Sequence, residues 1–179
     1  MQVSRQVREI KPNDVVYTPL LVALDMINEC NITPDMKVLD PSKGKGVFYD
    51  NFPECNKYSC EIEDGNDFFD FHEPVDLVVG NPPFSIWTKW LEHTCTLTDK
   101  FCYIFSAFNL TDKRVRDIRD KGFGITYFKI LKVDWWFAMS YIVIFERNKP
   151  SIIDVGEERI ICDICNTRCK RGRTHKGHK

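Results

Sequence analysis

The sequence predicts an α/β fold in which helices cover both faces of a mostly parallel sheet and the final strand runs antiparallel. Short apolar runs alternate with amphipathic segments along most of the chain, a pattern typical of parallel sheets. The turn Gly44-Lys45-Gly46 follows the first of these runs, as a glycine turn does in nucleotide-binding sheets. The last two strand-like runs, residues 125–131 and 140–146, indicate a closing antiparallel pair.

The helices are predicted from apolar spacing and from their first residues. Residues 19–29 form the first helix, with Thr18 as its N-cap and Pro19 in its first turn. Its packing side carries Leu20, Leu21, Ala23, Leu24 and Ile27. Residues 86–94 form the second helix, which packs through Trp87, Trp90 and Leu91. Residues 111–121 form a charged third helix. Parallel strands are expected at residues 37–40, 57–61, 77–80 and 101–105.

Length, charge and cysteine content suit one domain with a basic tail. The 179 residues suffice for a single core, and we place the domain at residues 1–150 and the tail at 151–179. The net charge of -1 conceals six Lys or Arg and no acid from Arg168 onward. No apolar run is long enough to cross a membrane, and the start lacks a signal peptide's apolar core. We therefore expect a cytoplasmic protein whose scattered cysteines are reduced.

The segment Asn81-Pro82-Pro83-Phe84 follows the apolar run of residues 75–80 and suits chemistry on a planar amine. The Asn81 side-chain oxygen and the Pro82 carbonyl would accept the two N–H groups of an adenine amine and make its nitrogen more nucleophilic. The same acceptors would stabilise the positive charge that develops during methyl transfer. The prolines would keep the loop rigid, and Phe84 would offer a stacking face. Taken alone, the four residues fit a strand-terminating turn equally well.

Residues before this segment suit a nucleoside cofactor. The first apolar run ends in Asp40, and the glycines after it let the backbone approach a ligand closely. Glu61 ends the next run, where an acid about 20 residues beyond the glycines accepts ribose hydroxyls. Asp67 and Phe68 suit an adenine amino group and ring face. For Glu61 or Asp67 taken alone, a solvated loop carboxylate is the alternative.

Taken in this order, the segments resemble the S-adenosylmethionine-dependent N6-adenine DNA methyltransferases over about residues 14–147. The motif order is that of the gamma subclass, and the spacing is similar to small enzymes of bacteriophage and other viral genomes. The resemblance implies a Rossmann-like fold with S-adenosylmethionine as cofactor. It implies cofactor contacts by Tyr17, Thr18, Pro19, Asp40, Pro41, Gly44, Gly46, Glu61, Asp67 and Phe68. It implies catalysis by Asn81, Pro82, Pro83 and Phe84.

Two departures from the family pattern stand out. The helix that usually separates the ribose acid from the next strand is nearly absent, because Glu61 and Asp67 are so close. The cofactor pocket is therefore expected to be shallow on that side. The glycine turn also carries Lys43 and Lys45 where small or apolar residues are common. These lysines would weaken cofactor binding or bring phosphate contacts near the site.

The aromatic residues before the last strand are candidates for target binding. An enzyme that acts on a duplex base must flip it out and stack it between flat side chains. In the family an aromatic of the corresponding loop does this. Phe84 on one side and Trp136 or Phe137 on the other would form the stack, with Phe137 favoured. A hydrophobic hairpin packed on the sheet is the alternative.

The tail combines cysteines, histidines and cations. Cys162, Cys165, Cys169 and His175 could fill a tetrahedral zinc site. A disordered basic arm with incidental thiols is the alternative. Either would attract a phosphate backbone in a salt-dependent manner. The third helix, with Lys113, Arg114, Arg116 and Arg119, would extend this surface or form an ordinary solvated face.

The sequence therefore predicts direct in-line transfer of a methyl group from S-adenosylmethionine to the N6 of a flipped-out adenine in DNA. Methylation of adenine in RNA is an alternative. So is methylation of a protein glutamine, although such enzymes usually carry an N-terminal helical domain, for which we expect too little chain before Asp14. A catalytically inactive nucleic-acid-binding module of the same fold is a third possibility, against which the intact residues 81–84 argue.

Overall fold

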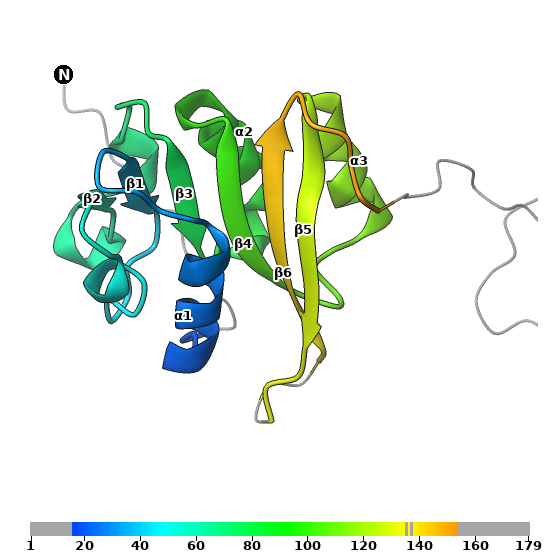
Figure 1. The fold of residues 1–179 in the computed structure, drawn as a ribbon, viewed down its shortest axis with the longest axis horizontal. Helices are drawn as coiled ribbons and strands as arrows, with labels where there is room; N and C mark the ends of the chain where they lie inside the picture. The colour runs from blue at the N-terminus through cyan, green and yellow to red at the C-terminus, as the bar shows by residue number, and fades with distance from the viewer. Residues whose placement is uncertain (1–15, 135, 137, 154–179) are drawn as a thin grey trace, which may run out of the picture.

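One six-stranded sheet, in the order β2-β1-β3-β4-β6-β5, forms the centre of the protein (Figure 1). The computed structural model describes residues 16–134, 136 and 138–153. The strands are β1 (Lys37–Asp40), β2 (Asn56–Ser59), β3 (Leu77–Gly80), β4 (Lys100–Ser106), β5 (Phe123–Leu131) and β6 (Ser140–Arg147). Strands β1 to β4 pair in parallel, whereas β6 is antiparallel to both of its neighbours. The predicted mixed sheet with a closing antiparallel pair is confirmed.

Helices cover both faces of the sheet, as predicted (Figure 1). Helix α1 (Leu20–Glu29) lies on one face, and α2 (Trp87–Leu97) and α3 (Asp112–Asp120) lie on the other. The strands supply a buried layer to each side because successive side chains point to opposite faces. In β3, Val78 belongs to the cluster under α2 and α3, while Leu77 and Val79 belong to the cluster under α1.

The start of α1 differs from the prediction. Its N-cap is Pro19, and no side chain caps the helix. Leu20 and Leu21 are 50% and 79% exposed, so they do not pack on the sheet as predicted. The buried stripe instead consists of Val22, Ala23, Met26 and Ile27. The apolar spacing of this helix fits either stripe, and only contact with the sheet selects between them.

The segment between β2 and β3 contains no α-helix, in agreement with the sequence. Two single turns of 3-10 helix, η3 (Ile62–Asp64) and η4 (Phe68–Asp70), take its place. Strand β2 ends at Ser59, two residues before the predicted end, because the Glu61 carboxylate caps η3 by accepting the Glu63 N–H. The chain beside the carboxyl end of β2 is therefore a short polar loop.

The folded body continues past the predicted boundary at residue 150. The Ile125 N–H donates to the Ser151 hydroxyl at 3.0 Å, and the Ile152 N–H donates to the Ile125 carbonyl at 2.9 Å. Ile153 packs on the core beneath α2 and α3. The candidate zinc ligands Cys162, Cys165, Cys169 and His175 lie outside the described residues.

Two further findings concern the part of the chain that the structure describes. No helix there combines the length and the apolar character needed to cross a bilayer. Its cysteines are free thiols, and three of them are buried. Burial raises the pKa of Cys60 to about 12 and of Cys95 to about 11, so neither has the thiolate character of a nucleophile at neutral pH.

Candidate active site

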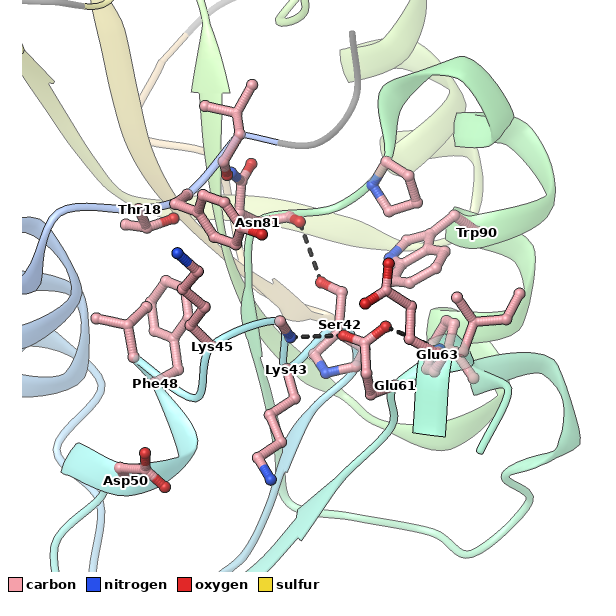
Figure 2. A pocket seen from close by; sticks show the side chains of 18 of the residues that line it. Thr18, Ser42, Lys43, Lys45, Phe48, Asp50, Glu61, Glu63, Asn81 and Trp90 are labelled. Carbon is pink, nitrogen blue, oxygen red and sulfur yellow. Dashed lines mark hydrogen bonds between the residues drawn. The ribbon is translucent and has the colours of Figure 1, made fainter. Parts of the chain in front are cut away.

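A cavity of about 850 Å³ opens at the carboxyl edge of the sheet, beside the ends of β1, β2 and β3 (Figure 2). Ligands bind at this edge in open α/β sheets because the loops after the strands converge there. Of the residues assigned to the cofactor by sequence, those that line the cavity are Tyr17, Thr18, Pro41, Gly44, Glu61, Asp67 and Phe68. Asn81 and Pro83 of the predicted catalytic segment line it too.

The remaining predicted residues lie around the cavity rather than on its wall. Asp40, Gly46 and Pro82 are buried, and each is adjacent in sequence to a residue that lines the cavity. Pro19 caps α1. Phe84 and Trp136 are half-buried and belong to opposite layers of the core. Phe137 lies outside the described residues. The roles assigned to these residues therefore stay predictions.

The glycine turn is shaped by two positive φ angles. Gly44 has a φ of 52° and Gly46 a φ of 83°, values that side chains other than glycine rarely adopt. A side chain at Gly46 would also meet the Asp50 carboxylate, whose Oδ2 lies 2.5 Å from the position of an added Cβ. Gly46 thus permits tight packing inside the loop, whereas Gly44 presents backbone to the cavity.

The Glu61 carboxylate joins the end of β2 to this turn. Oε2 accepts the Gly44 N–H at 2.6 Å, and Oε1 accepts the Glu63 N–H at 3.2 Å. Each carboxylate oxygen can accept a second hydrogen bond. The group is therefore held in place by the backbone and still has acceptor capacity for two neighbouring hydroxyls.

An apolar wall lies beyond Glu61. Phe68 is buried, and its ring centroid is 4.3 Å from that of Trp90. Trp90 is fixed in turn because its indole N–H donates to the Tyr103 hydroxyl at 3.1 Å. Asp67 accepts the Phe69 N–H at 3.0 Å, which orients the loop that carries Phe68. Sequence spacing identified Trp90 as a core residue and missed that it also lines the cavity.

The Asn81 amide is oriented by the chain that precedes α1. Its Nδ2 donates to the Val16 carbonyl at 2.9 Å. The Ser42 hydroxyl donates to the backbone carbonyl of Asn81 at 3.1 Å. Among the described residues none donates a hydrogen bond to the side-chain oxygen of Asn81, which remains available as an acceptor. Val16 and Ser42 lie beside residues that the sequence assigns to the cofactor, but sequence reasoning gave neither a role of its own.

Phe84 is already covered by other groups. Its ring stacks on Trp87 with centroids 5.7 Å apart, and the Arg114 guanidinium lies 5.3 Å from its centroid. Arg114 also donates to the Phe84 carbonyl at 3.1 Å and to the Asn109 carbonyl at 2.8 Å. Arg114 therefore does not belong to a solvated face of α3, and it ties that helix to the loop after β3.

Two other cations of α3 form ion pairs on the surface of the helix. Lys113 binds Asp117 at 2.6 Å and Arg116 binds Asp112 at 2.9 Å, both one helical turn away. Such pairs are common on solvated helices and stabilise them by a few tenths of a kcal/mol. These pairs favour the ordinary solvated face over a nucleic-acid surface for this part of α3.

Asp40 is buried beneath the glycine turn. The Ser42 N–H donates to its Oδ1 at 3.2 Å, while Oδ2 is buried with no partner among the described residues. Burial raises the pKa of Asp40 to about 7, and the backbone N–H groups oppose that rise. The carboxyl group therefore exchanges its proton near neutral pH, from a position that does not line the cavity.

Solved structures that match this fold include several methyltransferases. A protein from Pyrococcus horikoshii, provisionally assigned as an RNA methyltransferase, matches 73% of this chain and 85% of its own at 18% identity with a TM-score of 0.60. The magnesium protoporphyrin IX methyltransferase of Synechocystis PCC 6803, solved with bound S-adenosylmethionine, matches 71% of this chain and 76% of its own at 16% identity with a TM-score of 0.54.

A third neighbour acts on a protein. In the Mtq2–Trm112 complex of E. cuniculi, responsible for methylation of the eRF1 translation termination factor, the match spans 73% of this chain and 98% of that one at 16% identity with a TM-score of 0.57. No family profile matches the sequence, and no curated protein does. At these identities the likeness establishes a Rossmann-like methyltransferase fold.

Proposed function

We propose that this protein is an S-adenosylmethionine-dependent methyltransferase that modifies the N6 of adenine in DNA. The observation that carries the proposal is the orientation of the Asn81 amide, whose nitrogen is held by the Val16 carbonyl at 2.9 Å beside the cavity. This bond directs the amide oxygen to act as an acceptor. An acceptor is what a planar amine with two N–H groups requires.

The cavity suits the cofactor in size and chemistry. Its volume of about 850 Å³ falls within the range of pockets that enclose small ligands. Glu61 offers acceptors for ribose hydroxyls, and Phe68 with Trp90 offers an apolar wall for a purine. When bound, S-adenosylmethionine supplies an electrophilic methyl group on a sulfonium.

The chain's own part in the reaction is to hold and polarise the target amine. The Asn81 oxygen and the Pro82 carbonyl accept its two N–H groups, which concentrates the lone pair on nitrogen. They also stabilise the positive charge that nitrogen gains as the new C–N bond forms and the C–S bond breaks. The methylated ammonium is strongly acidic, so water takes its proton and no general base is required.

Two exposed apolar side chains at the carboxyl edge of the sheet support a nucleobase as target. Phe108 follows β4 and is 68% exposed, and Met139 precedes β6 and is 41% exposed. The Ala107 N–H donates to the Met139 carbonyl at 2.8 Å, so the two loops adjoin at the carboxyl edge. Exposed apolar side chains of this kind suit the face of a base that has left the stack.

Adenine in RNA presents the same amine and is the second candidate, favoured by the provisional RNA assignment of the Pyrococcus horikoshii neighbour. The test uses full-length protein with isotope-labelled S-adenosylmethionine and three substrates: duplex genomic DNA from cells without adenine methylation, the same DNA denatured, and total RNA. Digestion to nucleosides and mass spectrometry identify the product. We expect labelled N6-methyldeoxyadenosine.

Each other outcome has a distinct meaning. Label in N6-methyladenosine from RNA alone would assign the enzyme to RNA. Label on another base would contradict the target that we assign to Asn81. Cofactor binding without transfer to any substrate would support an inactive module of the same fold.

A further inference from the structure

We propose that Lys45 binds the carboxylate of the cofactor's methionine part and thereby selects an amino-acid-bearing cofactor; this inference rests on the proposed function. Lys45 lines the cavity from the glycine turn. Its Nζ lies 4.4 Å from the centroid of the Tyr17 ring. Figure 2 shows the side chain extending from the turn towards Thr18.

The surroundings of Lys45 lack a counter-charge. No carboxylate among the described residues lies within ion-pair distance of its Nζ. The Tyr17 ring holds the ammonium by a cation–π contact, which limits the freedom of a long side chain. The Thr18 side chain is 8% exposed and lies beside it, with a hydroxyl that can donate to the same anion. These groups form an anion-binding corner in the cavity wall.

The position of this corner fits the cofactor's length. Glu61 and the Phe68–Trp90 wall suit the nucleoside part, and in Figure 2 Glu61 and Trp90 lie across the cavity from Lys45. Asn81 lies between the two sides, where the methyl group must be delivered. The carboxylate carbon, four bonds beyond the sulfonium sulfur, then falls on the side of Lys45.

Lys43 provides a matched comparison. It belongs to the same turn, but its Nζ lies 5.2 Å from the Tyr49 ring, which also receives Lys57 at 4.8 Å. Figure 2 shows the Lys43 side chain directed away from Lys45 and Thr18. Both lysines line the cavity and carry equal charge on one loop, but only the Lys45 side chain extends towards Thr18, where we place the carboxylate.

The test measures binding of S-adenosylmethionine and of decarboxylated S-adenosylmethionine, which lacks only the carboxylate, by calorimetry. In the wild-type protein we expect the intact cofactor to bind about 10- to 100-fold more tightly, the range for a charged hydrogen bond. Lys45→Met should lose most of this preference, and Lys45→Arg should retain part of it. Lys43→Met should behave like the wild type.

Failures of the two proposals are distinguishable. Tight wild-type binding of both ligands, with a preference that Lys45→Met leaves unchanged, would overturn the role of Lys45 and leave the cofactor assignment intact. Equal weakening of both ligands by Lys45→Met would also overturn it, because the effect would then come from the loop rather than the carboxylate. Failure of the wild-type protein to bind either ligand would contradict the proposed function.

Discussion

The Ser42 hydroxyl donates to the backbone carbonyl of Asn81 at 3.1 Å and so joins the loop after β1 to the loop after β3. The same two loops touch through Pro41, whose Cδ lies 3.1 Å from the position that a Cβ on Gly80 would occupy. A glycine at the end of β3 thus lets the two loops pack closely. The groups assigned to the cofactor and to the target amine are held as one unit, which in-line transfer requires.

Arg114 of α3 is expected to hold the loop after β3 in position through Phe84. Arg114→Ala removes the hydrogen bond to the Phe84 carbonyl and the cation over the Phe84 ring. We expect kcat to fall on the order of 10- to 100-fold with little change in the KM for S-adenosylmethionine, since small misplacements of reacting groups are costly. Steady-state kinetics on the methylated substrate measures both.

Two variants act as controls for Arg114. Lys113→Ala removes one charge from the same helix at a surface ion pair and should leave kcat unchanged. Arg114→Lys keeps the charge but loses the planar fork, so it should restore only part of the rate. An equal loss in Lys113→Ala, or a normal rate in Arg114→Ala, would contradict the positioning role.

Glu61 is predicted to bind the cofactor ribose. Glu61→Ala leaves two hydroxyls without a charged acceptor, so S-adenosylmethionine affinity should fall about 10- to 100-fold. Glu61→Gln keeps an oxygen acceptor and should lose less. Calorimetry with Glu63→Gln as control measures the effect. Unchanged affinity in Glu61→Ala, with a loss in Glu63→Gln, would place the ribose against Glu63 instead.

Asp40 should make stability depend on pH. Burial raises its pKa from 3.8 to about 7 in the folded protein. The folded state therefore binds more protons than the unfolded chain between these values, and this carboxyl lowers stability as pH rises from about 4 to about 7. Asp40→Asn cannot ionise and should be more stable than the wild type at pH 8, by up to about 4 kcal/mol.

Urea denaturation at pH 5 and pH 8 checks the Asp40 prediction. The stability of the variant relative to the wild type should rise by about 3 kcal/mol between pH 5 and pH 8, because the unfolded carboxyl is already ionised at pH 5 whereas the folded one ionises only near pH 7. A difference that is constant across this range would mean that Asp40 does not titrate as proposed. Comparing the two proteins at each pH removes the contribution of all other titrating groups.

The effect of removing the tail is best tested by a truncation that keeps residues 151–153. Truncation after Ile153, rather than after residue 150, keeps the contacts of residues 151–153 with β5 and the core. The fold and cofactor binding should survive. DNA affinity should fall, and the slope of log affinity against log salt should become shallower because the six cations from Arg168 onward are removed. Titrations at several salt concentrations measure this, and an unchanged slope would contradict it.

Zinc in the tail requires its own measurement. If Cys162, Cys165, Cys169 and His175 bind zinc, the full chain should contain about one ion per molecule. The double substitution Cys162→Ser with Cys165→Ser should abolish it. A full-length protein that contains no metal would contradict the zinc site and favour the alternative, a basic arm with incidental thiols.

The positions of the strands, the closing antiparallel pair and both helical layers follow from local pattern, whereas the order of the strands in the sheet does not. Apolar runs of four to seven residues identify buried strands, and the absence of a helical pattern between residues 131 and 140 identifies the closing pair. Register and packing direction depend on partners far away in sequence. Leu20 and Leu21 were assigned to the core on spacing, but contact with the sheet selected Val22 and Met26.

The site likewise combines residues that local sequence pattern identifies with residues that only the fold brings together. Glu61, Gly44 and Asn81 carry local signals, because an acid after a strand, a glycine turn and an Asn-Pro segment each restrict the chain's chemistry. Val16, Ser42 and Arg114 act through hydrogen bonds across the fold, and no spacing predicts these bonds. Lys45 was noted in the sequence as a departure from the family pattern, and its placement beside Tyr17 gives that departure a function to test.

The most direct test of the central claim compares wild-type protein with Asn81→Ala. Labelled S-adenosylmethionine and adenine-unmethylated DNA are supplied to both, N6-methyldeoxyadenosine is quantified by mass spectrometry, and cofactor affinity is measured in parallel. We expect the wild type to form the product and Asn81→Ala to lose on the order of a hundredfold or more in rate with nearly unchanged cofactor affinity. Near-normal methylation by Asn81→Ala would contradict the account.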